Sequence, residues 1–131
     1  MIPKFRAWDK RKNVMRDVAV LHFTKNGKIN SIEYWITPTE LKTYHVRNVE
    51  LMQSTRLKDK NGVEIFEGDL VEHDDNINGV WETFEACEIV YDEGYAQFCF
   101  KWDAGNFLTD YRNLNVIGNI YENPELLEGE K

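Results

Sequence analysis

The stretch EACEIVYDEGYAQFCFKW, residues 85–102, contains two apolar runs around a turn signal. The runs Glu85–Tyr91 and Tyr95–Trp102 flank Asp92-Glu93-Gly94, a sequence that favours a tight reversal. In the second run the side chains alternate between an apolar and a polar set, which is the period of a half-buried strand. The apolar set is Ala96, Phe98, Phe100 and Trp102, and the polar set is Gln97, Cys99 and Lys101. The stretch predicts a β-hairpin and places Cys99 on the more polar face.

Turn signals recur along the chain on both sides of this hairpin. Asn-Gly occurs three times, and it favours the type I′ turn, whose twist matches that of a β-hairpin. The three pairs are Asn26-Gly27, Asn61-Gly62 and Asn78-Gly79. Turns at short intervals, with β-branched and aromatic runs between them, indicate an all-β chain. The other predicted strands are Lys4–Asp9, Val14–Phe23, Lys28–Trp35, Asn48–Gln53, Asp69–His73 and Asn115–Tyr121.

Two short segments predict helix instead. Thr37 can cap a helix, Pro38 suits its first position, and Glu40 completes a capping box. This pattern predicts one short helix in the first half, ending near His45. A helical turn is also predicted to start at Pro124 and to cover Glu125–Leu127.

Size and composition are those of a small globular protein. The 131 residues suit one domain, or two small lobes that share a core. No segment approaches the ~20 apolar residues that a membrane helix needs, and the first residues lack the apolar run of a signal peptide. We therefore expect a cytoplasmic protein with no membrane partner. Cys87 and Cys99 are then expected to be reduced thiols.

Charge is distributed unevenly along the sequence. Residues 1–60 hold 13 Lys/Arg and 6 Asp/Glu, a balance of +7, whereas residues 61–131 hold 3 Lys/Arg and 17 Asp/Glu, a balance of −14. The two halves can pair their charges within one molecule. Alternatively, the basic part of one copy meets the acidic part of another, because opposed potentials steer encounter. The pattern makes a homo-oligomer an expected partner state and leaves both arrangements open.

The chain shows little that points to catalysis. The densest acidic cluster is Asp69, Glu72, Asp74 and Asp75, and such carboxylates could bind Mg²⁺. Their places beside a turn and a loop favour ordinary surface roles instead. His22, His45 and His73 are too widely spaced for a zinc motif, and no glycine-rich phosphate loop or activated nucleophile is evident. We therefore predict no catalytic, cofactor-binding or metal-binding residue.

Two binding alternatives use the charged halves. The first half interleaves basic residues, which neutralise phosphates, with aromatic residues, which stack on bases. The basic residues are Lys10-Arg11-Lys12, Arg16, Lys25, Lys28, Lys42 and Arg47, and the aromatic ones are Trp8, Tyr34, Trp35 and Tyr44. The acidic half could instead imitate nucleic acid and occupy a basic groove of a host protein. We rank nucleic-acid binding below self-association and acidic mimicry below both.

Three segments resemble the YopX family, a group of small proteins encoded mainly by bacteriophages and prophages of Gram-positive bacteria. They are KFRAWD (4–9), ELMQSTRLKDKNG (50–62) with Glu64-Ile65 and Glu67-Gly68-Asp69 after it, and VIGNIYENPELL (116–127). Their order and spacing span nearly the whole chain. One departure is Arg56, where the family more often has Gly, and this is expected to alter one turn.

The resemblance implies a phage origin, a mainly β fold and no established activity, so no functional residues are carried over. The recurring residues also have structural interpretations: Asn61-Gly62 makes a turn, Glu67-Gly68-Asp69 redirects the chain into a strand, and Trp8 packs on the core. The stretch Gly68–Val71, followed by the 85–102 hairpin, is also similar to the start of small SH3-like barrels.

These observations together give one overall hypothesis. We predict an all-β, YopX-like domain over residues 1–131, with a possible division into a basic lobe (1–60) and an acidic lobe (61–127). The acidic lobe is predicted to be a bent sheet or an SH3-like barrel. The function that we favour is a non-enzymatic phage accessory or interaction protein that self-associates, with a host or phage protein as a further partner.

Overall fold

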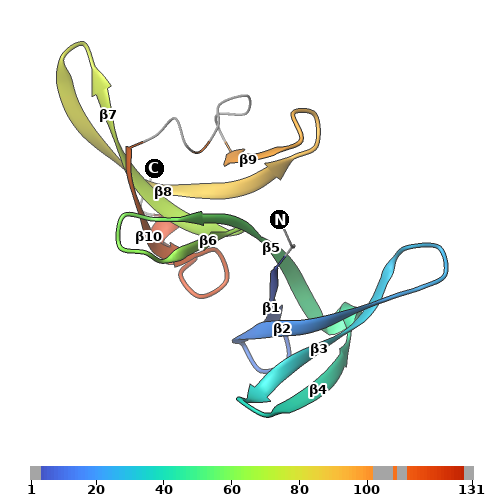
Figure 1. Ribbon diagram of the computed structural model, residues 1–131. Coiled ribbons are helices and arrows are strands. Elements are labelled where there is room, and N and C mark those ends of the chain that lie inside the picture. The colour runs from blue at the N-terminus through green and yellow to red at the C-terminus, as the bar shows by residue number, and fades with distance from the viewer. Residues whose placement is uncertain (1–3, 102–107, 109–111, 129–131) are drawn as a thin grey trace. The chain divides into compact units, whose positions relative to one another are not determined.

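The computed structural model describes residues 4–101, 108 and 112–128, and most of them lie in antiparallel strands (Figure 1). The chain divides into two compact units. Unit 1 comprises residues 1–54 and unit 2 comprises residues 55–131. The mainly β prediction is therefore confirmed, and each unit is described by itself.

Unit 1 is an antiparallel sheet in the order β4-β3-β2-β1-β5, in which β1 to β4 form a meander and β5 pairs with β1. Its elements are β1 (Phe5–Asp9), β2 (Val14–Phe23), β3 (Ile29–Thr37), β4 (Glu40–His45), the 3-10 turn η1 (Val46–Asn48) and the first part of β5 (Val49–Lys58). Ala7, Ile32, Tyr34 and Val49 form its buried core. Full burial of such a side chain contributes about 1.5–3 kcal/mol, so this small cluster is a major source of the unit's stability.

Unit 2 contains a four-stranded antiparallel sheet in the order β10-β7-β8-β9. Its elements are β6 (Glu64–Phe66), β7 (Asp69–Ile77), β8 (Val80–Asp92), β9 (Gln97–Phe100), β10 (Arg112–Asn119) and α1 (Glu125–Glu128). The core residues are Ile65, Val71, Cys87, Ile89, Phe100 and Leu108. The buried ring of His73 stacks between Phe84 and Phe100, with centroid distances of 5.3 and 4.9 Å. The terminal helix agrees with the turn predicted after Pro124.

The predicted strands and turn positions are largely confirmed, and several strands run longer than predicted. The type I′ geometry holds for one of the three Asn-Gly pairs and is wrong for the other two, because Asn26 and Asn61 do not have a positive φ. Asn78 and Gly79 have φ values of 53° and 86°, so both adopt the left-handed conformation that a type I′ turn requires. The turn joins β7 to β8, and Ile77 lies directly opposite Val80. The predicted strands Asp69–His73 and Glu85–Tyr91 leave out the outer part of this hairpin.

The bent-sheet alternative for unit 2 has local support, whereas the SH3-like barrel is not confirmed. Ala86 has a φ of 54°, and the register between β7 and β8 shifts beside it. Such a bulge bends a strand and increases its twist. In the described part of the sheet, β9 and β10 lie at opposite edges.

The helix predicted from Thr37 to His45 is wrong, because residues 40–45 form β4. Thr37 Oγ1 accepts a hydrogen bond from the Thr39 N–H at 3.3 Å, which is the local bond expected of a cap, but it stabilises a turn between β3 and β4. Pairing with β3 then outweighs the local helix signal. Within residues 4–54, the part of unit 1 that the structure describes, the one helical segment is the 3-10 turn η1.

The placement of Cys99 on a polar face is also wrong. Cys99 is fully buried, as is its neighbour Phe100. Consecutive residues of a strand point to opposite faces, so both faces of β9 are covered at this point. Both cysteines are free thiols, as predicted.

Candidate functional site

The acidic cluster of β7 does not form a common site. The surface role predicted for Asp69 is wrong, because this residue is buried and its carboxylate accepts a 2.8 Å hydrogen bond from the Phe66 N–H. Glu72 accepts one from Asn115 Nδ2, also at 2.8 Å. Asp74 accepts hydrogen bonds from Thr83 Oγ1 and Asn113 Nδ2, and these hold the pKa of its carboxyl below the ordinary value. Among the described residues, no group of three or more His, Cys, Asp or Glu could hold a metal ion.

Asp9 shows that a recurring polar residue of the first motif serves the fold. It is fully buried at the end of β1. One oxygen accepts the backbone N–H groups of Arg11 and Lys12 at 3.0 and 3.1 Å. The other oxygen faces the Arg16 guanidinium, whose Nε and Nη2 lie 3.4 and 3.3 Å away. This carboxylate therefore shapes the basic turn and binds the guanidinium of Arg16 on the following strand, β2.

Asp59 performs the equivalent task in the second motif. Its Oδ1 accepts the N–H groups of Asn61 and Val63, and its Oδ2 accepts that of Val116 on β10 at 2.9 Å. Burial alone would raise the pKa of Asp59, but the hydrogen bonds from Val116, Val63 and Asn61 outweigh it and lower the pKa. The LKDKNG run is thus a turn that is fastened to β10.

Asn119 closes the third motif in the same way. Its Oδ1 accepts the N–H groups of Tyr121 and Glu122, and its own N–H donates to Asn123 Oδ1. A Cβ at Gly118 would clash with the Asn123 side chain, which explains the glycine there. The signal that could have identified these roles was present in the sequence, because Asp and Asn beside turn residues commonly bond to nearby backbone.

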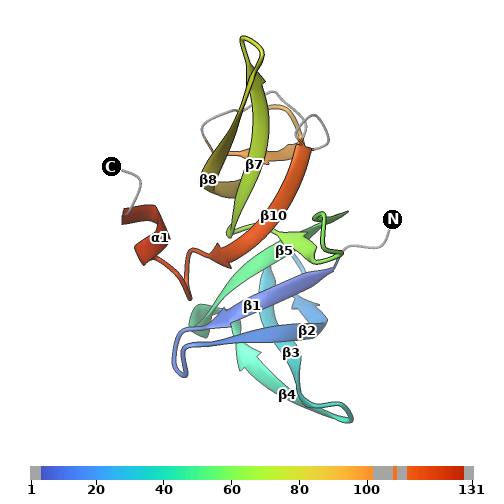
Figure 2. The same cartoon turned by 90° about the vertical axis from the view of Figure 1, so that its left-hand side faces the viewer.

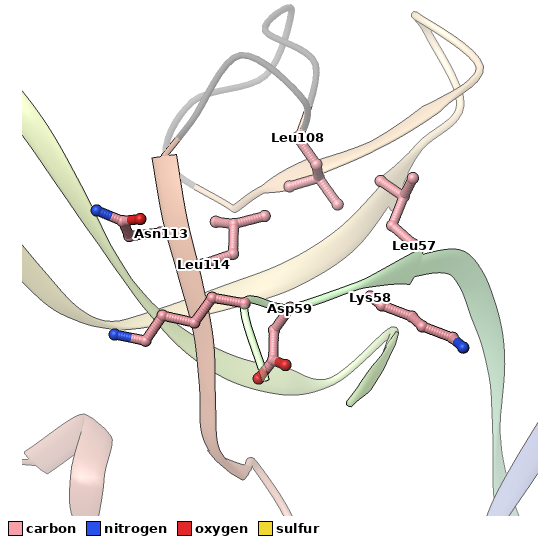
Figure 3. A pocket seen from close by; sticks show the side chains of 7 residues that line it. Leu57, Lys58, Asp59, Leu108, Asn113 and Leu114 are labelled. Atoms are coloured by element: carbon pink, nitrogen blue, oxygen red, sulfur yellow. The ribbon is translucent and has the colours of Figure 1, made fainter. Parts of the chain in front are cut away.

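A small pocket of about 300 Å³ lies beside Asp59 in unit 2 (Figure 3). Figure 3 shows Leu57, Leu108 and Leu114 on one side of the pocket and Asp59 on the other side, next to the β10 ribbon. Both Asp59 oxygens already accept backbone hydrogen bonds. The pocket is therefore a mixed recess, lined by three leucines together with Lys58, Lys60 and Asn113, in which the Asp59 carboxylate is already held by the backbone.

Some of the basic and aromatic residues of unit 1 are buried or held in contacts within the chain, and others are exposed. Tyr34 is buried, and burial raises the pKa of its hydroxyl. The Arg16 guanidinium lies 4.8 Å from the centre of the Tyr34 ring, and Lys42 lies 5.8 Å from that of Tyr44. Lys10 pairs with Glu50 at 3.3 Å on the surface. Trp35 is exposed. Tyr34 therefore cannot serve as a base-stacking platform, whereas Trp35 can.

Unit 1 also carries an apolar pocket of about 540 Å³. Its walls come from the four neighbouring strands β3, β2, β1 and β5, and Lys4 and Gln53 contribute polar groups. The apolar lining consists of Phe5, Val18, Ala19, Leu21, Phe23 and Ile29. Phe23 and Ile29 are cross-strand partners beside the Asn26-Gly27 turn, and the same turn carries Lys25 and Lys28. The pocket thus combines an apolar floor with cations nearby.

Unit 2 carries an exposed apolar end. In Figures 1 and 2 the β7–β8 hairpin extends beyond β9 and β10. Ile77, Val80 and Trp81 lie at its end, with 42%, 60% and 57% of their surface exposed. Asp75 and Glu82 are directly opposite each other, two cross-strand pairs back from Ile77 and Val80. We call residues 75–82 the hairpin tip.

The formal charges follow the division into units. Unit 1 holds 10 Lys/Arg and 5 Asp/Glu, a balance of +5, and unit 2 holds 6 Lys/Arg and 18 Asp/Glu, a balance of −12. In the described part of the chain, no helix is long and apolar enough to cross a membrane. Two surfaces described above have exposed apolar side chains close to charged residues in the sequence. They are the pocket of unit 1 and the hairpin tip of unit 2.

Comparison with known proteins gives a family and a structural neighbour. The model of the family described as YopX protein matches residues 4–128. A crystal structure of protein EF1440 from Enterococcus faecalis has a TM-score of 0.70 and 34% sequence identity, and the match covers 97% of this chain and 99% of that one. Comparison with curated proteins finds no match.

Proposed function

The chain belongs to the YopX protein family, and from this premise we propose that it is a non-enzymatic interaction module that self-associates. The observation that carries the proposal is the opposite charge of the two units, +5 and −12. Opposed potentials steer encounter between copies and fix the register in which they meet. The motif residues Asp9, Asp59 and Asn119 are occupied by turn hydrogen bonds, and this supports a scaffold rather than a catalyst.

We assign the module to a bacteriophage or prophage, where it acts as an accessory protein in the host cytoplasm. This assignment is supported by the source of the proteins that the three motifs resemble. The genes that flank it provide a direct check. Neighbouring phage replication, structural or lysogeny genes are expected, and a purely housekeeping neighbourhood would contradict the assignment.

Sedimentation velocity across a salt series tests self-association. The protein is measured from about 1 μM to about 1 mM, a range that brackets weak dissociation constants. We expect assembly near 50 mM salt that weakens towards about 1 M salt, where the Debye length falls to about 3 Å. A monomer at every concentration and every salt level would reject the proposal.

Nucleic-acid binding is the second candidate, favoured by one specific arrangement. The Lys10 N–H donates to the Asn48 carbonyl at 3.0 Å, which brings the Lys10-Arg11-Lys12 turn beside the segment that holds Arg47. The test is retention on immobilised single-stranded DNA and RNA at about 50 mM salt, with release as salt rises. Absence of retention would eliminate this candidate without affecting self-association.

A further inference from the structure

The end of the β7–β8 hairpin exposes apolar side chains on both of its faces. Directly opposite residues of an antiparallel pair share a face, so Ile77 and Val80 lie together on one face. Trp81 lies opposite Asn76 on the other face. All three apolar side chains are more than two-fifths exposed. A narrow projection of this kind is suited to insertion into a recess.

The same tip carries an unfavourable charge arrangement. Asp75 lies directly opposite Glu82, on the face that also holds Ile77 and Val80. Like charges in this position destabilise a sheet. Neither carboxylate forms an ion pair within the described part of the chain. A cationic surface that covered this face would neutralise the repulsion while burying the apolar pair.

The pocket of unit 1 has the complementary properties. It has a volume of about 540 Å³, and Phe23, which is 59% exposed, lies at its end near the β2–β3 turn. Lys25 and Lys28 lie in that turn. Among the described residues, neither lysine forms an ion pair. The pocket therefore provides an apolar recess, and the turn next to its lining residues Phe23 and Ile29 carries the cations that the tip lacks.

We propose that the hairpin tip of one copy docks in the unit 1 pocket of a second copy, with Ile77 and Val80 in the recess and Asp75 and Glu82 against Lys25 and Lys28. This inference rests on the self-association proposed above and names the surfaces that carry it. Because the two surfaces differ, the contact is heterologous and produces a ring or an open chain of copies. A tip of this size gives an interface below about 1,200 Å², so each contact is weak and assembly depends on concentration.

The test uses one variant of each surface in the full chain. Val80→Asp adds a charge to the tip, and Phe23→Asp adds one to the pocket; both side chains are exposed, so folding should be retained. Tyr95→Asp, at an exposed aromatic outside both surfaces, is the matched control. Circular dichroism confirms the fold of each. We expect the first two variants to weaken assembly at least about tenfold, the size of one well-placed contact of about 1.4 kcal/mol, and the control to leave it unchanged.

Mixing the variants gives the sharpest result. Val80→Asp keeps an intact pocket and Phe23→Asp keeps an intact tip, so an equimolar mixture should form a complex of one chain of each and stop at twice the 15.5-kDa mass. If the wild type assembles but neither variant weakens it, this docking is overturned and self-association stands. If the wild type is monomeric, both proposals fail. If the variants change only the compactness of a monomer, the tip docks within its own chain and the inference is overturned.

Discussion

Asp9 in unit 1 and Asp59 in unit 2 both hold a tight turn with a buried carboxylate, but different groups neutralise the two charges. Asp9 combines two backbone N–H groups with the Arg16 guanidinium, and its bonds reach at most seven residues along the chain. Asp59 accepts three backbone N–H groups, and one of them, that of Val116, lies 57 residues away. One carboxylate organises a local turn, and the other joins distant segments.

The difference shows how the two units use charge. In unit 1 a side-chain cation compensates the buried carboxylate, and this cation is partly open to water. In unit 2 the compensation comes from backbone dipoles that the fold itself must hold in place. We therefore expect unit 2 to respond more strongly when its carboxylate is removed, and the following predictions test that ranking.

Replacing Asp59 should have the largest effect. Asp59→Ala leaves three N–H groups without their acceptor, two of them in the 61–63 turn and one on β10, and each such loss costs about 1–3 kcal/mol. We expect the free energy of unfolding in urea to fall by about 3–5 kcal/mol. Amide hydrogen exchange should accelerate at Val116 and Val63.

Asp59→Asn is the matched control, because it retains one acceptor oxygen and a similar shape. It should keep the turn and lose chiefly the bond to Val116, so its loss of stability should be about half as large. Equal stability of the alanine variant and the wild type would show that the backbone finds other partners, and the comparison between the two carboxylates would then fail.

Replacing Arg16, the cation that faces Asp9, should have a smaller effect on stability. Breaking a buried ion pair costs about 3–5 kcal/mol, but the Arg16 side chain is 20% exposed and its contacts to Asp9 are 3.3 Å or longer, so we expect about 2 kcal/mol for Arg16→Gln. Arg16→Lys should lie between wild type and Gln, because lysine keeps the charge but not the planar contact with Tyr34. A larger loss for Arg16→Gln than for Asp59→Ala would reverse the proposed ranking.

The pH dependence of the Asp59 contribution gives a further difference. Its folded-state pKa is lowered, so the stability it contributes is complete above the unfolded pKa of about 3.9 and is lost as pH falls through the folded pKa. The difference in unfolding free energy between wild type and Asp59→Asn should therefore be constant from about pH 5 to pH 7 and shrink below about pH 4. Urea titrations at each pH measure it. If the difference in unfolding free energy stays the same below about pH 4, protonation of Asp59 does not break its hydrogen bonds to the turn and to β10.

The turns and most strands could be predicted because their causes are local. Asn78-Gly79 needs two left-handed residues, and the chain supplies the two residue types that adopt this conformation most readily. The segment after Thr37 could not be predicted in this way. Its capping pattern forms a local hydrogen bond, but pairing with β3 decides the outcome, and that pairing depends on residues 31–35, which precede the capping pattern.

The candidate surfaces were harder to predict than the fold. The apolar residues beside Asn26-Gly27 and Asn78-Gly79 are visible in the sequence, but whether Phe23 or Trp81 is buried depends on which elements cover it. The structure leaves both exposed. The acidic residues of β7 are adjacent in sequence, yet alternation along the strand and separate partners disperse them. These acidic residues are therefore close in sequence, but they do not form a common site in the folded strand.

The smallest predicted effect concerns Arg56, the departure from the second motif. Its φ of 62° lies in the left-handed region, which costs a non-glycine residue roughly 1–2 kcal/mol, and glycine adopts it without this strain. Arg56→Gly relieves the strain, gives up a partly exposed contact with Glu64 at 3.8 Å, and increases the entropy of the unfolded chain. We expect a net gain of about 0.5 kcal/mol in unfolding free energy, since these opposing terms nearly cancel.

Arg56→Ala separates the effect of backbone strain from that of the ion pair. It removes the contact with Glu64 but keeps the left-handed strain. Glycine at this position should therefore exceed alanine by about 1 kcal/mol in urea unfolding. Both variants alter the first residues of unit 2, so they also test whether the second motif favours glycine for its backbone conformation. Equal stability of the two variants would show that the strain at Arg56 contributes nothing, and another reason for glycine at this position would then be needed.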